Sequence, residues 1–197
     1  FSNVRVIGIG GSTLGTLSIY DFLKTKIRKK FEFIENLKKN ISNKKSKRYL
    51  NLVVSKSGET LETIINSNIY IKKRDKNIFI TDNKKSYLNI LANKLKSEIV
   101  HHNNFIGGRY SVLSEVGMLP AELMGLSSNK FRQLNNLIKN QKYLNSLVSN
   151  VGSILHHINT KKYNSIIINY DDQSKSLFSW YQQLLAESLG KKQKGIL

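Results

Sequence analysis

The chain has 197 residues, 40% of them hydrophobic, and its 32 Lys and Arg against 13 Asp and Glu give a formal net charge of +19. This length and apolar content allow one sizeable core, or one domain and part of another. The lack of cysteine excludes disulfides and thiolate metal sites, and no apolar run approaches the roughly 18 residues that a membrane-spanning helix needs. We therefore expect a cytoplasmic protein with no membrane partner.

The high positive charge by itself would indicate a nucleic-acid-binding protein. However, the lysine-rich stretches at 38–47 and 72–76 contain no aromatic residues that would stack on bases. We interpret the lysines as a solvated surface that helps to attract anionic ligands, and we predict no nucleic-acid partner. A basic nucleic-acid-binding domain stays as a rival interpretation, and it requires an affinity that falls steeply with salt.

The chain starts with a strand, a glycine-rich loop and a helix. Residues 4–9 have the apolar character of a buried strand, residues 10–15 form the loop, and helical spacing continues to about Phe22. The dinucleotide-binding fingerprint needs a glycine where Thr13 stands, so the pattern disfavours a nucleotide. Gly11 and Ser12 suit a compact polar ligand held against bare backbone amides, with a simple tight turn as the alternative.

A second unit of the same kind follows. The apolar run 50–54 predicts a buried strand, residues 55–60 (Ser-Lys-Ser-Gly-Glu-Thr) a polar loop, and the residues from 61 to about 73 a helix. Free N–H groups and the helix dipole stabilise an anion at such a helix N-terminus, and the three hydroxyls of the loop add donors. The loop therefore predicts a phosphate site, although an ordinary Ser/Thr helix cap uses the same residue types.

The other elements of the first 125 residues complete an α/β pattern. We expect further strands at 31–34, 77–81 and 98–101, helices at 84–96 and 112–125, and a weakly helical segment between residues 35 and 48. Strands that alternate with helices predict a three-layer α/β/α sandwich around a parallel sheet. Ligands of such sheets bind beyond the carboxyl ends of the strands, where both polar loops fall.

The second half of the chain is predicted to be mostly helical. Residues 130–158 have helical spacing, residues 165–169 restart the strand pattern, and residues 177–189 form a strongly apolar helix that ends at Gly190. We therefore divide the chain into an α/β domain at 1–125, a helical linker at 126–160 and the incomplete beginning of a second such domain at 161–197.

Two more places carry residues suited to catalysis. Gly107 and Gly108 allow a tight turn before Arg109, whose planar guanidinium suits a phosphate or a developing enediolate oxygen. Gln183 and Glu187 are four residues apart, so they share one face of the last helix. The alternative for Arg109 is a surface arginine after a turn, and on spacing alone Glu187 is a surface carboxylate near a helix cap.

Together these stretches resemble the glucose-6-phosphate isomerase (phosphoglucose isomerase) family, in its bacterial form. The matching pieces are Ile-Gly-Gly-Ser-Thr-Leu-Gly at 9–15, Ser-Lys-Ser-Gly-Glu-Thr at 55–60, Gly-Gly-Arg-Tyr-Ser at 107–111 and Ala-Glu-Ser-Leu-Gly-Lys at 186–191. Each piece is moderately specific. Four of them in this order, across almost the whole chain, make a specific combination.

The resemblance implies roles in substrate binding. The sugar phosphate would be held by the side chains of Ser55, Ser57 and Thr60 and by the backbone around Lys56, while Gly11 and Ser12 would line the sugar. Glu59 departs from the pattern, because bacterial members commonly carry threonine there. We expect this substitution to be tolerated, with the Glu59 side chain turned to solvent.

The resemblance also implies a reaction. Glucose 6-phosphate and fructose 6-phosphate would interconvert as Glu187 moves a proton between C2 and C1, Arg109 stabilises the enediolate and Gln183 places the substrate. No metal or organic cofactor is required. The alternative is a non-catalytic phosphosugar-binding module of the same fold, which would keep the Ser/Thr loop without needing Arg109 or Glu187.

The family also uses a histidine and a lysine from its C-terminal part to open the sugar ring, and the histidine comes from the partner subunit of a homodimer. Neither motif occurs in this sequence. We therefore expect a central fragment that is inactive alone, taken from a full-length homodimeric isomerase.

Overall fold

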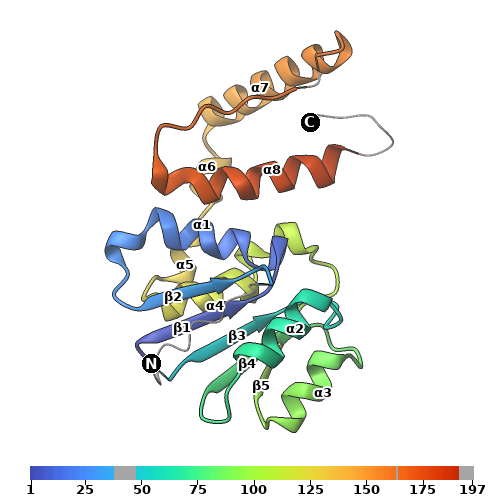
Figure 1. Cartoon of the computed structure of the whole chain (residues 1–197). Helices are drawn as coiled ribbons and strands as arrows, with labels where there is room; N and C mark the ends of the chain where they lie inside the picture. The colour runs from blue at the N-terminus through green and yellow to red at the C-terminus, as the bar shows by residue number, and fades with distance from the viewer. Residues whose placement is uncertain (38–47, 163, 191–197) are drawn as a thin grey trace.

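The computed structural model describes residues 1–37, 48–162 and 164–190, so the segment expected to be weakly helical lies largely outside the described residues. A five-stranded parallel sheet stands at the centre, in the order β2-β1-β3-β4-β5 (Figure 1). Its strands are β1 Asn3–Ile7, β2 Lys30–Ile34, β3 Leu50–Val54, β4 Lys76–Thr81 and β5 Glu98–His101. All five lie where the apolar runs predict them.

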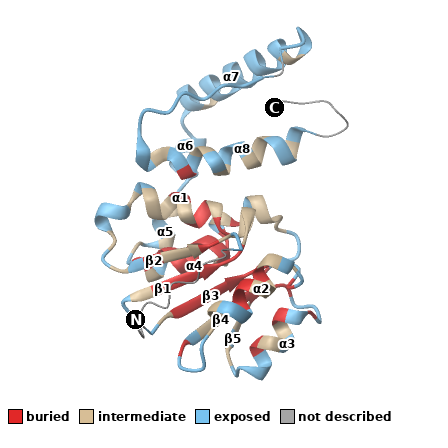
Figure 2. Cartoon of the chain, viewed as in Figure 1, coloured by how far each residue is buried: buried red, intermediate tan, exposed pale blue. Residues whose placement is uncertain are grey.

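Helices cover both faces of the sheet. One core cluster joins alternate strand residues such as Val6 and Leu52 to α1 (Leu14–Phe22) and α4 (Glu115–Leu123). The other joins Val53 and Phe79 to α2 (Leu61–Tyr70) and α3 (Tyr87–Lys94). Figure 2 shows the buried residues concentrated in these layers. The predicted three-layer α/β/α sandwich is therefore confirmed.

Several capping side chains fix where these helices begin. The Ser86 hydroxyl accepts the Asn89 N–H at the start of α3, and the Ser114 hydroxyl accepts the Val116 N–H at the start of α4. Such caps satisfy N–H groups that have no partner inside the helix. Short 3₁₀ turns at η1 (Gly10–Ser12) and η3 (Gly108–Leu113) shape the loops that precede α1 and α4.

The second half of the chain is helical with interruptions. It contains α5 Ser128–Phe131, α6 Asn135–Ile138, α7 Gln141–Asn159, the 3₁₀ turn η4 Asp172–Ser174 and α8 Lys175–Leu189. Helix α8 packs along α1, while α7 stands away from the sheet (Figure 1). Gly190 occupies the C-cap of α8 as expected.

One predicted strand is wrong. Residues 165–169 form neither helix nor strand, although their apolar run is typical of a buried strand. A strand exists through backbone hydrogen bonds to a neighbour, and the described strands all belong to the sheet of the first half. The segment instead leaves Ile166 85% and Ile168 71% exposed.

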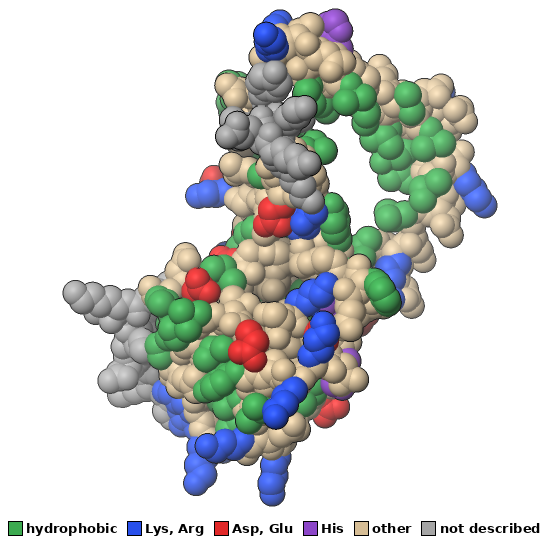
Figure 3. Space-filling model, turned by 90° about the vertical axis from the view of Figure 1, so that its right-hand side faces the viewer, with side chains coloured by type: hydrophobic (Ala, Val, Ile, Leu, Met, Phe, Trp, Pro, Cys, Tyr) green, Lys and Arg blue, Asp and Glu red, His purple; other side chains and the backbone are tan. Residues whose placement is uncertain are grey.

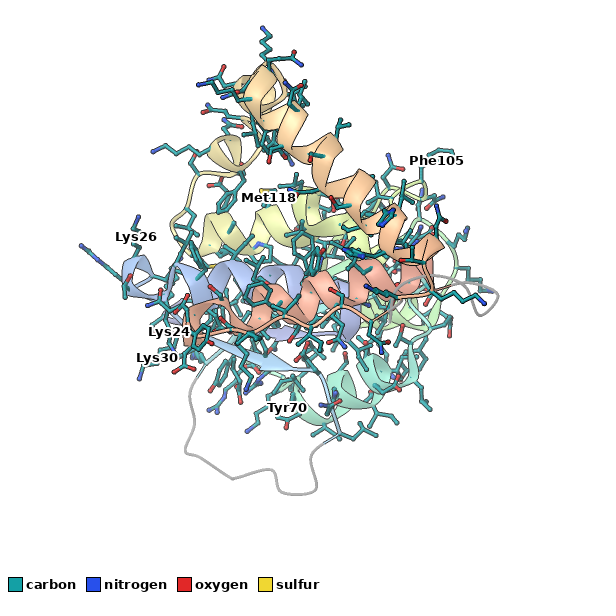
Figure 4. The ribbon with its side chains drawn as sticks, turned by 90° about the horizontal axis from the view of Figure 1, so that it is seen from above. Lys24, Lys26, Lys30, Tyr70, Phe105 and Met118 are labelled. Carbon is teal, nitrogen blue, oxygen red and sulfur yellow. The ribbon has the colours of Figure 1, made fainter. Side chains whose placement is uncertain are left out.

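Three lysines near the start of β2 are exposed to solvent. Lys24 and Lys26 lie in the connection between α1 and β2, and Lys30 is the first residue of β2, so all three are near the amino ends of the strands. Figure 4 shows them at the opposite end of the molecule from Phe105, which follows β5. These lysines therefore do not line the loops at the carboxyl ends of the strands.

No helix within 1–37, 48–162 and 164–190 has the length and apolar character needed to cross a membrane.

Candidate active site

The glycine-rich loop after β1 lies directly against the loop that carries Arg109. A Cβ added to Gly11 would come 2.5 Å from the carbonyl carbon of Gly108 and 2.6 Å from the Arg109 nitrogen. The Ser111 hydroxyl also donates to the Gly11 carbonyl at 3.3 Å. Only glycine permits this backbone approach. Gly11 is therefore needed to bring two loops together, and Ser12 closes the turn by donating its N–H to the Ile9 carbonyl at 3.2 Å.

Arg109 is fixed by contacts from α8 and from its own loop. Its Nε donates to the Ser188 hydroxyl at 3.0 Å, and the Trp180 ring N–H donates to the Arg109 carbonyl at 3.1 Å. The guanidinium also stands over the Tyr110 ring, 4.7 Å from its centre. The pKa of Arg109 is raised above its usual range, first by a hydrogen bond with the Tyr110 side chain and also by the carboxylate of Glu187. Arg109 is thus a cation held in place where its loop meets α8.

Gln183 and Glu187 complete a hydrogen-bonded group with Arg109. The Gln183 amide donates to Glu187 Oε1 at 2.7 Å, and Arg109 donates to Glu187 Oε2 at 3.4 Å. The Gln183 side-chain oxygen is buried without a hydrogen-bond partner among the described atoms. A Cβ on Gly10, whose φ is +57°, would lie 3.1 Å from the Gln183 amide nitrogen. The two α8 side chains therefore face the glycine-rich loop and Arg109, which the sequence predicted to share one site.

The Ser55–Thr60 loop is a separate, internally bonded unit at the same sheet edge. The Ser55 hydroxyl lies 2.9 Å from the Thr60 hydroxyl and accepts the Gly58 N–H at 3.2 Å, while the Ser57 hydroxyl accepts the Glu59 N–H at 3.2 Å. Thr60 is the N-cap residue of α2, yet its side chain makes no capping hydrogen bond. This geometry does not match the alternative of an ordinary side-chain cap.

Gly58 and Glu59 join the same loop to the start of α3. Gly58 has a φ of +67°, and a Cβ there would collide with the Ser86 hydroxyl. The Leu88 N–H donates to the Gly58 carbonyl at 3.2 Å, and the Tyr87 N–H donates to Glu59 Oε1 at 2.7 Å. The Glu59 side chain is exposed as expected, but it also caps α3. The sequence alone had assigned it no structural contact.

The side chain of Lys56 points to the Arg109 loop. Its ammonium donates to the carbonyls of Asn104 at 2.7 Å and Ile106 at 2.9 Å. The ammonium therefore connects the loop after β3 with the loop after β5. The two polar loops are neighbours, since a Cβ on Gly8 would lie 2.8 Å from the Val54 carbonyl oxygen just before Ser55.

The residues that hold Arg109 were missed by sequence reasoning. Tyr110 and Ser188 share a contact of 2.7 Å between their hydroxyls, and each directly follows a predicted site residue. Trp180 lies three residues before Gln183 and seven before Glu187, a spacing that places all three on one helix face. Helical spacing around Gln183 could have identified Trp180. The contacts of Tyr110 and Ser188 join residues 78 positions apart, and no local pattern shows them.

Comparisons with known proteins agree with these loops. The sequence model of the family described as "Phosphoglucose isomerase" matches residues 1–195. A glucose-6-phosphate isomerase of Methanocaldococcus jannaschii is 33% identical over 218 residues, covering 100% of this chain and 52% of that protein. One of Acholeplasma laidlawii is 33% identical over 231 residues, covering 98% of this chain and 52% of that protein. The chain thus spans about half the length of these relatives.

Solved structures share the fold. A hypothetical protein from Thermus thermophilus superposes with a TM-score of 0.77 at 24% identity, covering 100% of this chain and 51% of that one. A tagatose-6-phosphate ketose/aldose isomerase from Escherichia coli superposes with a TM-score of 0.68 at 13% identity, covering 99% of this chain and 55% of that one. With a family match over nearly all its residues and the glycine-rich, Ser/Thr and arginine loops of that family at one sheet edge, this chain belongs to the phosphoglucose isomerase family.

Proposed function

We propose that the protein containing this chain interconverts glucose 6-phosphate and fructose 6-phosphate through an enediolate. The observation that carries the proposal is the group formed by Arg109, Gln183 and Glu187, which come from two distant segments and are joined by hydrogen bonds of 2.7 and 3.4 Å. A cation beside a carboxylate that lies 47% exposed in its side chain is suited to a substrate that develops negative charge. The relatives that cover this chain are named for this reaction.

In the proposed mechanism Glu187 acts as the base. Its carboxylate takes the proton from C2 of the open-chain aldose, and the electron pair of that bond forms the C1–C2 double bond of the enediolate. Arg109 stabilises the negative charge on the enediolate oxygen. This interaction is stronger in the transition state than in the substrate, because the charge develops as the reaction proceeds. Glu187 then returns its proton to C1, while the O2 proton is released and one is taken up at O1, so that no proton or electron is gained or lost overall.

The Ser55–Thr60 loop is proposed to hold the phosphate. Its three hydroxyls and the uncapped start of α2 supply donors at one place, and the helix dipole there favours an anion. Binding energy from the phosphate, remote from the reacting carbons, would hold C1 and C2 against Glu187. Gly11 and Ser12, on the neighbouring loop, would line the sugar.

Replacing Glu187 by glutamine in the full-length protein tests the role of the base. We expect kcat to fall by roughly 10²–10⁴-fold, while binding of a five-carbon phosphosugar acid stays close to that of the unaltered protein. Glu98→Gln, an exposed carboxylate at the amino end of β5, is the matched control and should leave both quantities unchanged. An active Glu187→Gln protein would contradict the assignment of the base.

The same experiment separates catalysis from binding. A full-length protein that binds phosphosugars but never isomerises them would support the non-catalytic module instead. Ser57→Ala should raise KM and weaken binding of the phosphosugar acid without a comparable loss of kcat. Binding that ignores Ser57→Ala would contradict the phosphate assignment of the loop.

We further propose that residues 161–197 begin a second domain of the same type. The extended segment 164–170 and α8 border a cavity of about 680 Å³ with apolar walls from Ile166, Ile167, Phe178 and Leu185. Figure 3 shows hydrophobic side chains along the inner surface of the arm formed by α7, residues 164–170 and α8.

The full-length protein is proposed to be a cytoplasmic homodimer. Its mass, measured by sedimentation equilibrium, tests whether it is a dimer.

A further inference from the structure

The loop between β5 and η3 places Arg109, and one of its carbonyl groups is held from two sides. The ring nitrogen Nε2 of His102 lies 3.1 Å from the Ile106 carbonyl oxygen. The Lys56 ammonium donates to the same oxygen at 2.9 Å and to the Asn104 carbonyl at 2.7 Å. Ile106 directly precedes the two glycines that lead into Arg109, so both contacts act close to the guanidinium along the chain.

His102 is itself held by the start of α4. The residue is 3% exposed, and its backbone N–H donates to the Thr81 carbonyl at 2.8 Å. The second ring nitrogen, Nδ1, contacts the carboxylate of Glu115. Glu115 is the first residue of α4, where the helix dipole favours a carboxylate. A chain of polar contacts therefore runs from α4 through Glu115 and His102 to the Ile106 carbonyl.

Each of the two contacts of the His102 ring requires an N–H on the ring. Both ring nitrogens face acceptors, a carboxylate at Nδ1 and a carbonyl at Nε2. A neutral imidazole carries one N–H and satisfies one of them, whereas an imidazolium satisfies both. The charged groups around the ring are Glu115 on α4 and Lys56 on the loop after β3, which shares the Ile106 carbonyl. A buried ring between two acceptors fixes its neighbours through directional hydrogen bonds as well as through packing.

We propose that His102 and Glu115 are positioning residues that, with the Lys56 ammonium, hold the Ile106 carbonyl and thereby keep Arg109 fixed relative to the Ser55–Thr60 loop. We call these three side chains the Ile106 clamp. The inference rests on the proposed function, since it states how the phosphate loop and the enediolate-stabilising arginine are kept in register. The clamp joins the segments that follow β3, β5 and η3.

The test uses the full-length protein with His102→Ala, and with His101→Ala as the matched control. His101 is the exposed neighbour at the end of β5. We expect His102→Ala to lower kcat roughly 10–100-fold with KM changed less than about two-fold, because displacing Arg109 affects the transition state more than phosphate binding. His102→Gln keeps an N–H donor for Ile106 and should recover part of the loss, whereas a residue that only fills space would not show this rescue.

A second readout does not depend on activity. Hydrogen exchange of the amides in 103–109, measured without substrate, should be faster in His102→Ala and Lys56→Met than in the unaltered protein and in His101→Ala. Faster exchange in a protein that shows no isomerase activity would sustain the clamp and refute the proposed function. Exchange equal to that of His101→Ala, or a His102→Ala protein with unchanged kcat, would overturn the clamp.

Discussion

The sheet half of the chain and the arm formed by α7, residues 164–170 and α8 bury their apolar side chains very differently. In the sheet, residues such as Leu52, Val53 and Phe79 have no exposed surface, and clusters close both faces. In the arm, α7 contains no buried residue and Tyr170 is 93% exposed. The first region is a finished core, whereas the second presents an apolar surface of the kind that another part of a protein covers.

The candidate site crosses the boundary between these two regions. Arg109 belongs to the sheet half, while Gln183 and Glu187 belong to α8, which is anchored by packing on α1 and by the contacts of Trp180 and Ser188 with Arg109. A complete core therefore positions the Ser55–Thr60 loop and Arg109, and the less complete region supplies Glu187, the proposed base.

The largest expected difference is in the effect of truncating an apolar side chain. Leu52→Ala removes a fully buried side chain between α1 and α4 and should lower the free energy of unfolding by about 2–5 kcal/mol. Val148→Ala, in α7 where the side chain is 70% exposed, should change it by less than about 0.5 kcal/mol. Urea unfolding of the chain followed by circular dichroism measures both. Equal losses would mean that α7 is buried to the same degree as the sheet.

A smaller difference is expected between two glycines. Gly58→Ala places a Cβ at a φ of +67° and against the Ser86 hydroxyl, so it should cost about 1–3 kcal/mol and weaken phosphosugar binding. Gly152→Ala lies inside α7, where an added Cβ meets nothing within 4 Å, and should stabilise the helix by about 0.5–1 kcal/mol. Thermal unfolding compares them. A Gly58→Ala chain as stable as the unaltered one would contradict the loop conformation.

The smallest effect is a pH dependence that reports on each region separately. The pKa of Glu122, at the end of α4, is lowered by hydrogen bonds from the Ser128 side chain and then from its backbone N–H. The pKa of Asp171, in the arm, is lowered by the Ser174 hydroxyl and then by the Gln173 N–H. Because both folded pKa values are lowered, the stabilisation is present above the usual carboxyl pKa and is lost as the pH falls through the folded value.

Carboxyl ¹³C NMR titration measures both groups in one sample. Both should titrate below their usual pKa, and Ser174→Ala should raise the pKa of Asp171 while that of Glu122 stays unchanged. A usual pKa at Asp171 together with a lowered one at Glu122 would show that residues 171–174 do not form the described turn in solution. That outcome would sharpen the contrast between the two regions.

Local sequence patterns predicted the sheet half well. Buried parallel strands are short apolar runs, so residues 50–54 and 77–81 could be placed within a residue or two, and the polar loops followed from them. The same rule failed at 165–169, because apolar character shows that a segment suits a strand but not whether a neighbour is present to pair with it. The failure falls in the region where the structure leaves the apolar surface open.

The site was predictable where its residues lie within one motif and not where distant segments meet. Helical spacing places Gln183 and Glu187 on one helix face, whereas their roles in the site were implied by the resemblance of residues 186–191 to the family. Three contacts each join residues 13 to 50 positions apart: the Lys56 ammonium with the Ile106 carbonyl, the Glu59 carboxylate with the start of α3, and the His102 ring with Glu115. Such contacts depend on the placement of elements in space, which a periodic pattern does not encode.

The placement of Glu187 on α8 has a consequence for the order in which the site comes into being during synthesis. Protein chains are made from the N-terminus, and domains fold as they emerge from the ribosome. The sheet, the Ser55–Thr60 loop and the Arg109 turn are therefore all available before the helix that packs on α1 and brings the glutamate. A nascent chain would acquire the proposed phosphate loop first and the proposed base last.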